Sequence, residues 1–208
     1  ISLVQSFKRL QETIEDIIIL IGKISEMRDP YTAGHQQRVA KLAYAIAKKM
    51  GLPEEQVKGI YMAAMIHDIG KIRVPSEILN NPGGLTEAEF SIIKGHPKNG
   101  YEILKSIKFP YPIANIVLQH HERINGSGYP QGLSGKNILL EARILAVADV
   151  VEAMSSRRPY RPTLGTKKAM KEIVEKSGFL YDPDVVAATV EVSKDGFSCF
   201  TDEGDIIY

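Results

Sequence analysis

The stretch from Ala63 to Lys71 constrains the fold most, because it places ionisable side chains inside an apolar run. It reads AAMIHDIGK, so His67 and Asp68 directly follow four apolar residues. Burying an unpaired carboxylate is unfavourable, and buried charges are normally paired or bound to a metal ion. A His-Asp pair that only caps a helix or bonds across the core is the simpler interpretation. The question is whether the rest of the chain supplies partners for Asp68.

Length and charge limit the classes of function. The 208 residues suffice for one substantial core, and 26 Lys and Arg nearly balance 25 Asp and Glu. Such a balance gives no general electrostatic reason for binding duplex nucleic acid or an anionic membrane. An anionic ligand would therefore be held by a local cluster of side chains.

Cysteine usage and hydropathy indicate a cytoplasmic chain. The single cysteine, Cys199, excludes internal disulfides and thiolate-rich metal sites, which fits a reducing compartment. Apolar runs such as Ile17 to Ile21 are too short to insert into a bilayer, and no signal-peptide pattern precedes that run. Because the sequence begins at Ile1, we expect a missing upstream sensory or regulatory domain, in which case this chain is the cytoplasmic part of a larger signalling protein.

Apolar residues at intervals of three and four predict an all-α fold with a small irregular C-terminal tail. A further helical segment begins at Pro97 and runs toward Leu104. The one exception to the helical pattern that we consider is a short strand pairing within residues 197–208. Thr86 and Glu89 form a capping-box pattern, which opens a helix with His96 near its end. The other expected helices cover residues 3–27, 34–50, 53–68, 111–121, 140–154 and 166–176, with a last one from 182 through 188.

The first helix has two compatible interpretations. Its apolar residues are Leu3, Phe7, Leu10, Ile14, Ile17, Ile18, Ile21 and Ile24, a spacing close to a heptad repeat. The helix either packs on the domain or forms a parallel coiled-coil linker that makes the protein a homodimer. We accordingly divide the chain into an N-terminal amphipathic helix, residues 1–27, and a domain, residues 28–208.

Seven side chains stand out as potential metal ligands. Any one of them alone is more simply a core or surface side chain, but together they supply nitrogen and oxygen donors for two adjacent divalent ions of the first transition row. Asp68 could bridge the two ions, which would remove the cost of burying its charge. The set includes every histidine of the chain: His35, His67, Asp68, His96, His120, His121 and Asp149.

Four separated motifs resemble the HD-GYP subfamily of HD-domain phosphohydrolases. His67 to Lys71 is similar to the HD-x-G-K signature, and residues 120–130, HHERINGSGYP, resemble HHE-R-x-D-G-x-G-Y-P. Residues 144–161, ILAVADVVEAMSSRRPYR, are similar to ILxVADxFDAMTSDRPYR, and residues 29–35, DPYTAGH, resemble the opening motif. The resemblance covers roughly residues 26–190, with the motifs in the same order.

This resemblance implies an HD-domain helical bundle that binds two iron or manganese ions and hydrolyses cyclic diguanylate. The product would be the linear dinucleotide and, in some members, GMP. Some relatives hold a third ion through a carboxylate four residues before the first histidine, where this chain has Tyr31, and Glu26 is a weak substitute. We therefore expect two ions. By position, His35, His67, Asp68 and Asp149 would bind one, and Asp68, His96, His120 and His121 the other.

The chemistry agrees with these assignments. Two adjacent ions can share a hydroxide as the nucleophile and hold the oxygens of an in-line phosphoryl displacement. Lys71 can contact the scissile phosphate or the bridging solvent. The resemblance assigns Arg158 and Arg161 to the substrate, while Tyr129 can stack on a base and Gly128 permits close approach of the backbone.

Three departures from the subfamily pattern leave other functions open. Asn125, Glu152 and Arg157 each replace an aspartate, and none of them is an expected metal ligand. We expect them to affect ligand orientation, loop support and substrate preference. The alternatives are a non-catalytic domain that binds a cyclic dinucleotide or acts as a scaffold, and an HD hydrolase for another nucleotide, such as a mixed cyclic dinucleotide.

Overall fold

The computed structural model describes residues 2–28, 33–81, 84–156 and 165–196. Within these ranges the fold is all-helical, as predicted, and the only bridges of β type are the isolated pairs Asn125–Ser134 and Ser177–Tyr181. The helices are α1 (Leu3–Glu26), α2 (His35–Lys49), α3 (Glu54–Ile66), η1 (Ile69–Arg73), α4 (Ser76–Leu79), α5 (Glu87–Ile93), α6 (His96–Leu104), α7 (Ile113–Gln119), η2 (Gly135–Asn137), α8 (Leu140–Ser155), α9 (Thr166–Glu175) and α10 (Pro183–Lys194). The expected pairing within residues 197–208 lies outside the described residues.

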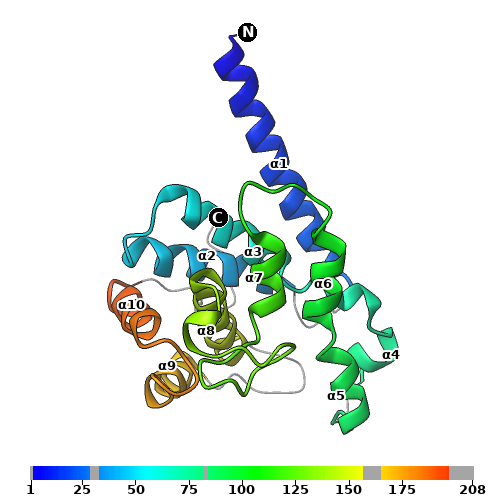
Figure 1. The fold of residues 1–208 in the computed structure, drawn as a ribbon, viewed down its shortest axis with the longest axis vertical. Coiled ribbons are helices and arrows are strands. Elements are labelled where there is room, and N and C mark those ends of the chain that lie inside the picture. The colour runs from blue at the N-terminus through cyan, green and yellow to red at the C-terminus, as the bar shows by residue number, and fades with distance from the viewer. Residues whose placement is uncertain (1, 29–32, 82–83, 157–164, 197–208) are drawn as a thin grey trace.

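The core lies between α2, α3, α7 and α8. Helix α2 packs on α3 and α8, and α7 packs on α3, α6 and α8. Their buried faces are aliphatic, with Ile46, Ile60, Ile116, Ile144 and Leu145 fully buried. Helices α9 and α10 cover α8 at one side of the bundle, whereas α4, α5 and α6 lie at the other side (Figure 1). This core fixes the helix ends from which the predicted ligands project.

Helix boundaries follow local signals in the sequence. Thr86 and Glu89 form the predicted capping box at the start of α5. Gly51 adopts φ +74° directly after the C-cap of α2, a left-handed conformation that glycine accepts without strain. A short helix, α4, follows Pro75 in a segment for which no helix was expected, and α10 continues past Ala188 to Lys194.

One predicted boundary is wrong and bears on the site. His96 begins α6 rather than lying near the end of the helix that Thr86 opens, since α5 ends at Ile93. The cause is Pro97, which has no backbone N–H to donate to the carbonyl of Ile93 and whose ring crowds that carbonyl. The ring Nδ1 of His96 is 2.8 Å from the same carbonyl oxygen.

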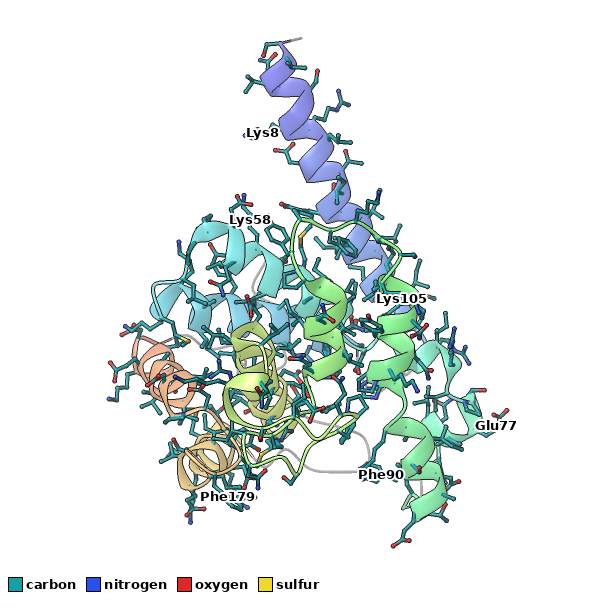
Figure 2. The ribbon with its side chains drawn as sticks, viewed as in Figure 1. Lys8, Lys58, Glu77, Phe90, Lys105 and Phe179 are labelled. Carbon is teal, nitrogen blue, oxygen red and sulfur yellow. The ribbon has the colours of Figure 1, made fainter. Side chains whose placement is uncertain are left out.

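The first helix leaves the domain. Its C-terminal part packs on α3 and η1, while its N-terminal part extends away from the other helices (Figure 1). Figure 2 shows Lys8 on the extended part, remote from the helical bundle. No helix among the described residues is long and apolar enough to cross a membrane.

Candidate metal centre

All seven predicted ligands meet at one place. Their donor atoms form three overlapping groups, each with all its atoms within 4.8 Å of one another. The groups are His35, His67 and Asp149; His67, Asp68 and His120; and His96, His120 and His121. We call the first group the His35 side and the last the His121 side. Asp68 lies between the two sides.

Direct contacts of Asp68 show how the two sides join. Its Oδ1 is 3.2 Å from Nε2 of His96, and its Oδ2 is 3.7 Å from Nε2 of His67. The Nζ of Lys71 donates to Oδ2 at 2.7 Å. Although burial opposes ionisation, Lys71, His67 and His96 together hold the pKa of Asp68 well below its usual range. The negative charge of the buried Asp68 carboxylate is therefore compensated by Lys71 and by histidines of both sides.

Three histidines share one local arrangement. His67, His96 and His120 each follow the end of a helix, and each ring Nδ1 lies 2.6–2.8 Å from the carbonyl oxygen three residues earlier. Carbonyls in the last turn of a helix have no partner within the helix, so an Nδ1–H can donate to them. That hydrogen bond selects the tautomer with a free electron pair on Nε2, the atom that points into the centre.

The fourth histidine is supported differently. His35 begins α2, and its Nε2 is 3.2 Å from Oδ1 of Asp149 in α8. Its Nδ1 pairs with Glu152, which is fully buried and also accepts hydrogen bonds from Arg38 Nε at 2.7 Å and Ser156 Oγ at 2.6 Å. Sequence reasoning placed Glu152 beyond the ligand shell, but it missed Arg38. Arg38 lies three residues after His35, on the same side of α2, and that spacing is the signal that could have found it.

Another carboxylate positions His35 through the backbone. Glu26, near the end of α1, accepts hydrogen bonds from the backbone N–H groups of Gly34 at 2.9 Å and Gln36 at 2.7 Å, on either side of His35. Both of its oxygens are thus engaged at the N-terminus of α2, where a negative charge is favourable. This arrangement gives Glu26 a capping role, and Tyr31 lies outside the described residues.

Protonation states suit metal binding at most of these positions. Burial lowers the pKa of His67, takes that of His120 well below its usual range and lowers that of His121 to about 3. At His35 burial acts in the same direction, but hydrogen bonds to Asp149 and Glu152 raise the pKa to about 9. Neutral imidazoles and ionised carboxylates are the forms that bind metal ions. The donor set fits two ions of the first transition row.

Tyr129 and Gly128 lie in the loop after the paired histidines. The Tyr129 ring is 4.7 Å from that of His121, centroid to centroid, and burial raises the pKa of its phenol. Gly128 packs against the backbone of residues 121–123, where an added Cβ would lie 2.4 Å from the Cα of Glu122. Its missing side chain therefore serves the close packing of this loop. Arg157, Arg158 and Arg161 lie outside the described residues.

The loop itself is held by two side chains. Glu122, which is buried, accepts backbone hydrogen bonds from Gln131 at 2.7 Å and Leu133 at 3.0 Å. Asn125 accepts hydrogen bonds from the N–H and the hydroxyl of Ser127 at 3.0 and 2.7 Å, as in an Asx turn. The departure at Asn125 thus preserves support for the loop.

Comparison with known proteins identifies the family. The model of the family described as "HD domain" matches residues 20–185. The chain is 42% identical over 188 residues to the cyclic di-GMP phosphodiesterase response regulator RpfG of Xanthomonas campestris. That alignment covers 89% of this chain and 50% of the relative. It is 38% identical over 159 residues to a 3'3'-cGAMP-specific phosphodiesterase of Vibrio cholerae, covering 76% of this chain and 37% of that protein.

The chain thus spans half or less of the length of these two relatives. Among solved structures, a cyclic GMP-AMP specific phosphodiesterase of V. cholerae has the same fold, with a TM-score of 0.68 and 16% identity over 87% of this chain and 49% of that one. The family match, these relatives and the helical fold agree with the motifs around the centre. The chain belongs to the HD domain family and is an HD domain of the HD-GYP type.

Proposed function

We propose that this chain is a metal-dependent phosphodiesterase that hydrolyses cyclic diguanylate to the linear dinucleotide and on to GMP in part. The observation that carries the proposal is the convergence of seven nitrogen and oxygen donors, with Asp68 between two groups. When bound there, two divalent ions supply Lewis-acid activation of water and hold phosphate oxygens during in-line displacement. Iron and manganese are the ions that we propose.

The proposed ligand roles follow the two sides. His35, His67, Asp68 and Asp149 hold one ion, and Asp68, His96, His120 and His121 hold the other. Lys71 keeps Asp68 ionised through its 2.7 Å contact and offers a positive charge to the scissile phosphate. We propose Asp68 and Lys71 as the residues closest to the chemistry.

Among the proposed substrate residues, Tyr129 and Gly128 lie beside the His121 side. Tyr129, stacked on His121, presents an aromatic ring beside the centre on which a base can stack. In the proposal, Gly128 keeps the loop close to the paired histidines, and Arg158 and Arg161 bind phosphate or guanine acceptor atoms. The reducing cytoplasm is the proposed location, which suits the single cysteine.

A second candidate substrate is 3'3'-cGAMP. It is favoured by the V. cholerae relative, whose identity to this chain is 38% against 42% for the cyclic di-GMP relative. Both substrates have the same phosphodiester ring and differ in one base. The distinction therefore depends on base contacts rather than on the metal ligands.

Turnover by the purified chain tests the proposal. Protein prepared without oxygen and loaded with Fe(II) or Mn(II) is incubated with cyclic diguanylate and 3'3'-cGAMP, separately and in competition. We expect linear product, with a higher kcat/KM for cyclic diguanylate. Preference for 3'3'-cGAMP selects the second candidate. Full metal occupancy without product from either substrate contradicts the proposal, and tight binding unaffected by Asp68→Ala then indicates a non-catalytic binding domain.

A further inference from the structure

We infer that the extended part of α1 binds a second copy of this chain as a parallel, two-stranded coiled coil. The inference starts from apolar residues that the domain leaves exposed. Leu3 is 86% exposed, Leu10 56%, Ile17 49% and Ile24 52%, although each lies in a regular helix. These four residues recur every seven positions. Phe7, Ile14 and Ile21 recur at the same interval, four residues after the first three.

This pattern is the a and d seam of a coiled coil. Phe7, Ile14 and Ile21 occupy position a, and Leu3, Leu10, Ile17 and Ile24 occupy position d. We call these seven residues the seam. Ile14 at a with Leu3 and Leu10 at d follows the combination that favours two parallel strands. Phe7 at a and Ile17 and Ile24 at d depart from it, so the number of strands is part of the test.

The charged residues of α1 support the same register. Every Lys, Arg, Asp and Glu in residues 3–26 falls at positions b, c or f, which face away from a partner helix. They are Lys8, Arg9, Glu12, Glu15, Asp16, Lys23 and Glu26. Positions e and g, which flank the seam, carry no charge, so two copies meet without repulsion between like charges.

The seam is distinct from the face that α1 uses for its own domain. Ile18 is only 5% exposed, and at Gly22 an added Cβ would lie 2.4 Å from the carbonyl oxygen of Met65 in α3. The hydroxyl of Ser25 lies 3.4 Å from the carbonyl oxygen of Asp68. Ile18, Gly22 and Ser25 occupy positions e and b. The domain therefore covers one face of α1 and leaves the described side chains of the adjacent seam exposed.

Helix stability gives an independent reason for a partner. Isolated helices shorter than about 12–15 residues are marginal in water. The part of α1 before Ile18 is of that length, and its described side chains are exposed (Figures 1 and 2). Among its described residues, the local supports include the Ser2–Gln5 capping box and the exposed Lys8–Glu12 pair at 3.9 Å. Packing of the seam on a second copy supplies the missing stabilisation.

The first test is the mass of the 208-residue chain in solution, measured by light scattering or sedimentation equilibrium at micromolar concentrations. We expect twice the 23.0 kDa of one chain. The double variant Leu10→Glu/Ile17→Glu introduces charges into the seam and should give the mass of a monomer. The matched control, Arg9→Glu/Gln5→Glu, places the same residue at outer positions c and f and should remain a dimer.

Hydrogen exchange measures the second consequence. Amides of residues 6–16 should be protected in the parent chain and the control, and exchange at least tenfold faster in the seam variant, while those of α2 and α3 stay unchanged. A monomeric parent chain overturns the inference. So does a trimer, or a dimer that survives the two seam substitutions, because its contact would lie elsewhere.

Cross-linking tests the orientation. In a Cys199→Ser background, a single Leu10→Cys substitution meets its own copy at a d position in the parallel arrangement and should form an intermolecular disulfide. In an antiparallel pair a d position faces an a position, for example residue 10 opposite residue 14, so the single variant would stay unlinked and the Leu10→Cys/Ile14→Cys variant would cross-link. That second result would overturn the parallel arrangement.

Discussion

The two sides of the candidate metal centre differ in one respect, because only the His35 side has a histidine ring that depends on a distant carboxylate. On the His121 side, the rings of His96 and His120 are oriented by backbone carbonyls three residues earlier. On the His35 side, the carbonyl of Ala64 orients His67 in the same way, but the ring of His35 depends on Glu152, which lies 117 residues further along the chain. A carbonyl of the local helix end is present wherever that helix forms. A distant carboxylate is present only after the domain has folded.

The comparison shows where substitutions can act selectively. Backbone carbonyls cannot be removed by a side-chain change, so the His121 side is sensitive chiefly to loss of its ligands. The His35 side can also be weakened through Glu152 and Glu26 while every ligand remains. Removing a residue that orients a metal ligand typically costs tenfold to a hundredfold in affinity or activity.

The largest effect is expected at the point that joins the two sides. Asp68→Asn keeps the shape of the side chain but removes the charge shared by both groups. We expect metal content to fall at both sides and kcat to fall by about 10²–10³-fold, the cost typical of losing one strong electrostatic group at an active site. Metal analysis and turnover of the same preparation measure this. Full occupancy at unchanged kcat would show that Asp68 does not join the sides.

Single-ligand variants should separate the sides. His35→Ala and His121→Ala make the same chemical change at opposite ends of the centre. Each should lose close to one equivalent of metal and retain the other, because the remaining group keeps its own donors. Metal analysis after gel filtration, with circular dichroism as a check of folding, measures the stoichiometry. Loss of both ions from either variant would show that the two sides bind cooperatively rather than separately.

A smaller effect should follow from Glu152→Gln, which tests the distant support directly. The amide cannot accept from both His35 and Arg38 as the carboxylate does, so the His35 ring loses its fixed orientation. We expect the affinity for the ion on the His35 side to fall about tenfold to a hundredfold, and the affinity for the ion on the His121 side to stay within about twofold. Competition with a chelator measures both affinities.

The matched control for that change is Glu141→Gln. Glu141 lies in the first turn of the same helix, where it accepts a hydrogen bond from Gln56 at 2.8 Å. It has no contact with the predicted ligands, so both affinities should match those of the parent chain. An equal loss in both variants would assign the effect to α8 as a whole.

The smallest effect is expected at Glu26. Glu26→Ala removes two hydrogen bonds to the N-terminus of α2, and loss of such a cap typically costs about 1 kcal/mol of unfolding free energy. Urea unfolding measures the loss, and Glu12→Ala on the exposed part of α1 should be neutral. Metal affinity at the His35 side should fall slightly. A loss confined to the His121 side would contradict the comparison.

Much of the candidate centre could be predicted from the sequence because its candidate ligands are recognisable from their local surroundings. Histidines and aspartates inside apolar helices are costly unless bound, so His67, Asp68 and Asp149 stood out without a structure. The helical periods and the capping box at Thr86 were likewise local signals, and the structure confirms them. The expected position of His96 near the end of the helix that Thr86 opens was wrong, because Pro97 prevents that helix from continuing past Ile93 to His96.

The sequence by itself indicated the helices, the seven candidate donor residues and the heptad spacing of α1, because each signal depends on residues within a few turns of one another. Only the tertiary structure decided which carboxylate orients His35, that Arg38 joins it, and that Glu26 caps α2. It also decided that α1 meets its domain through Ile18 and Gly22 rather than through the seam. Those contacts join residues far apart in the chain, and local pattern carries no information about which distant side chain will pack against which.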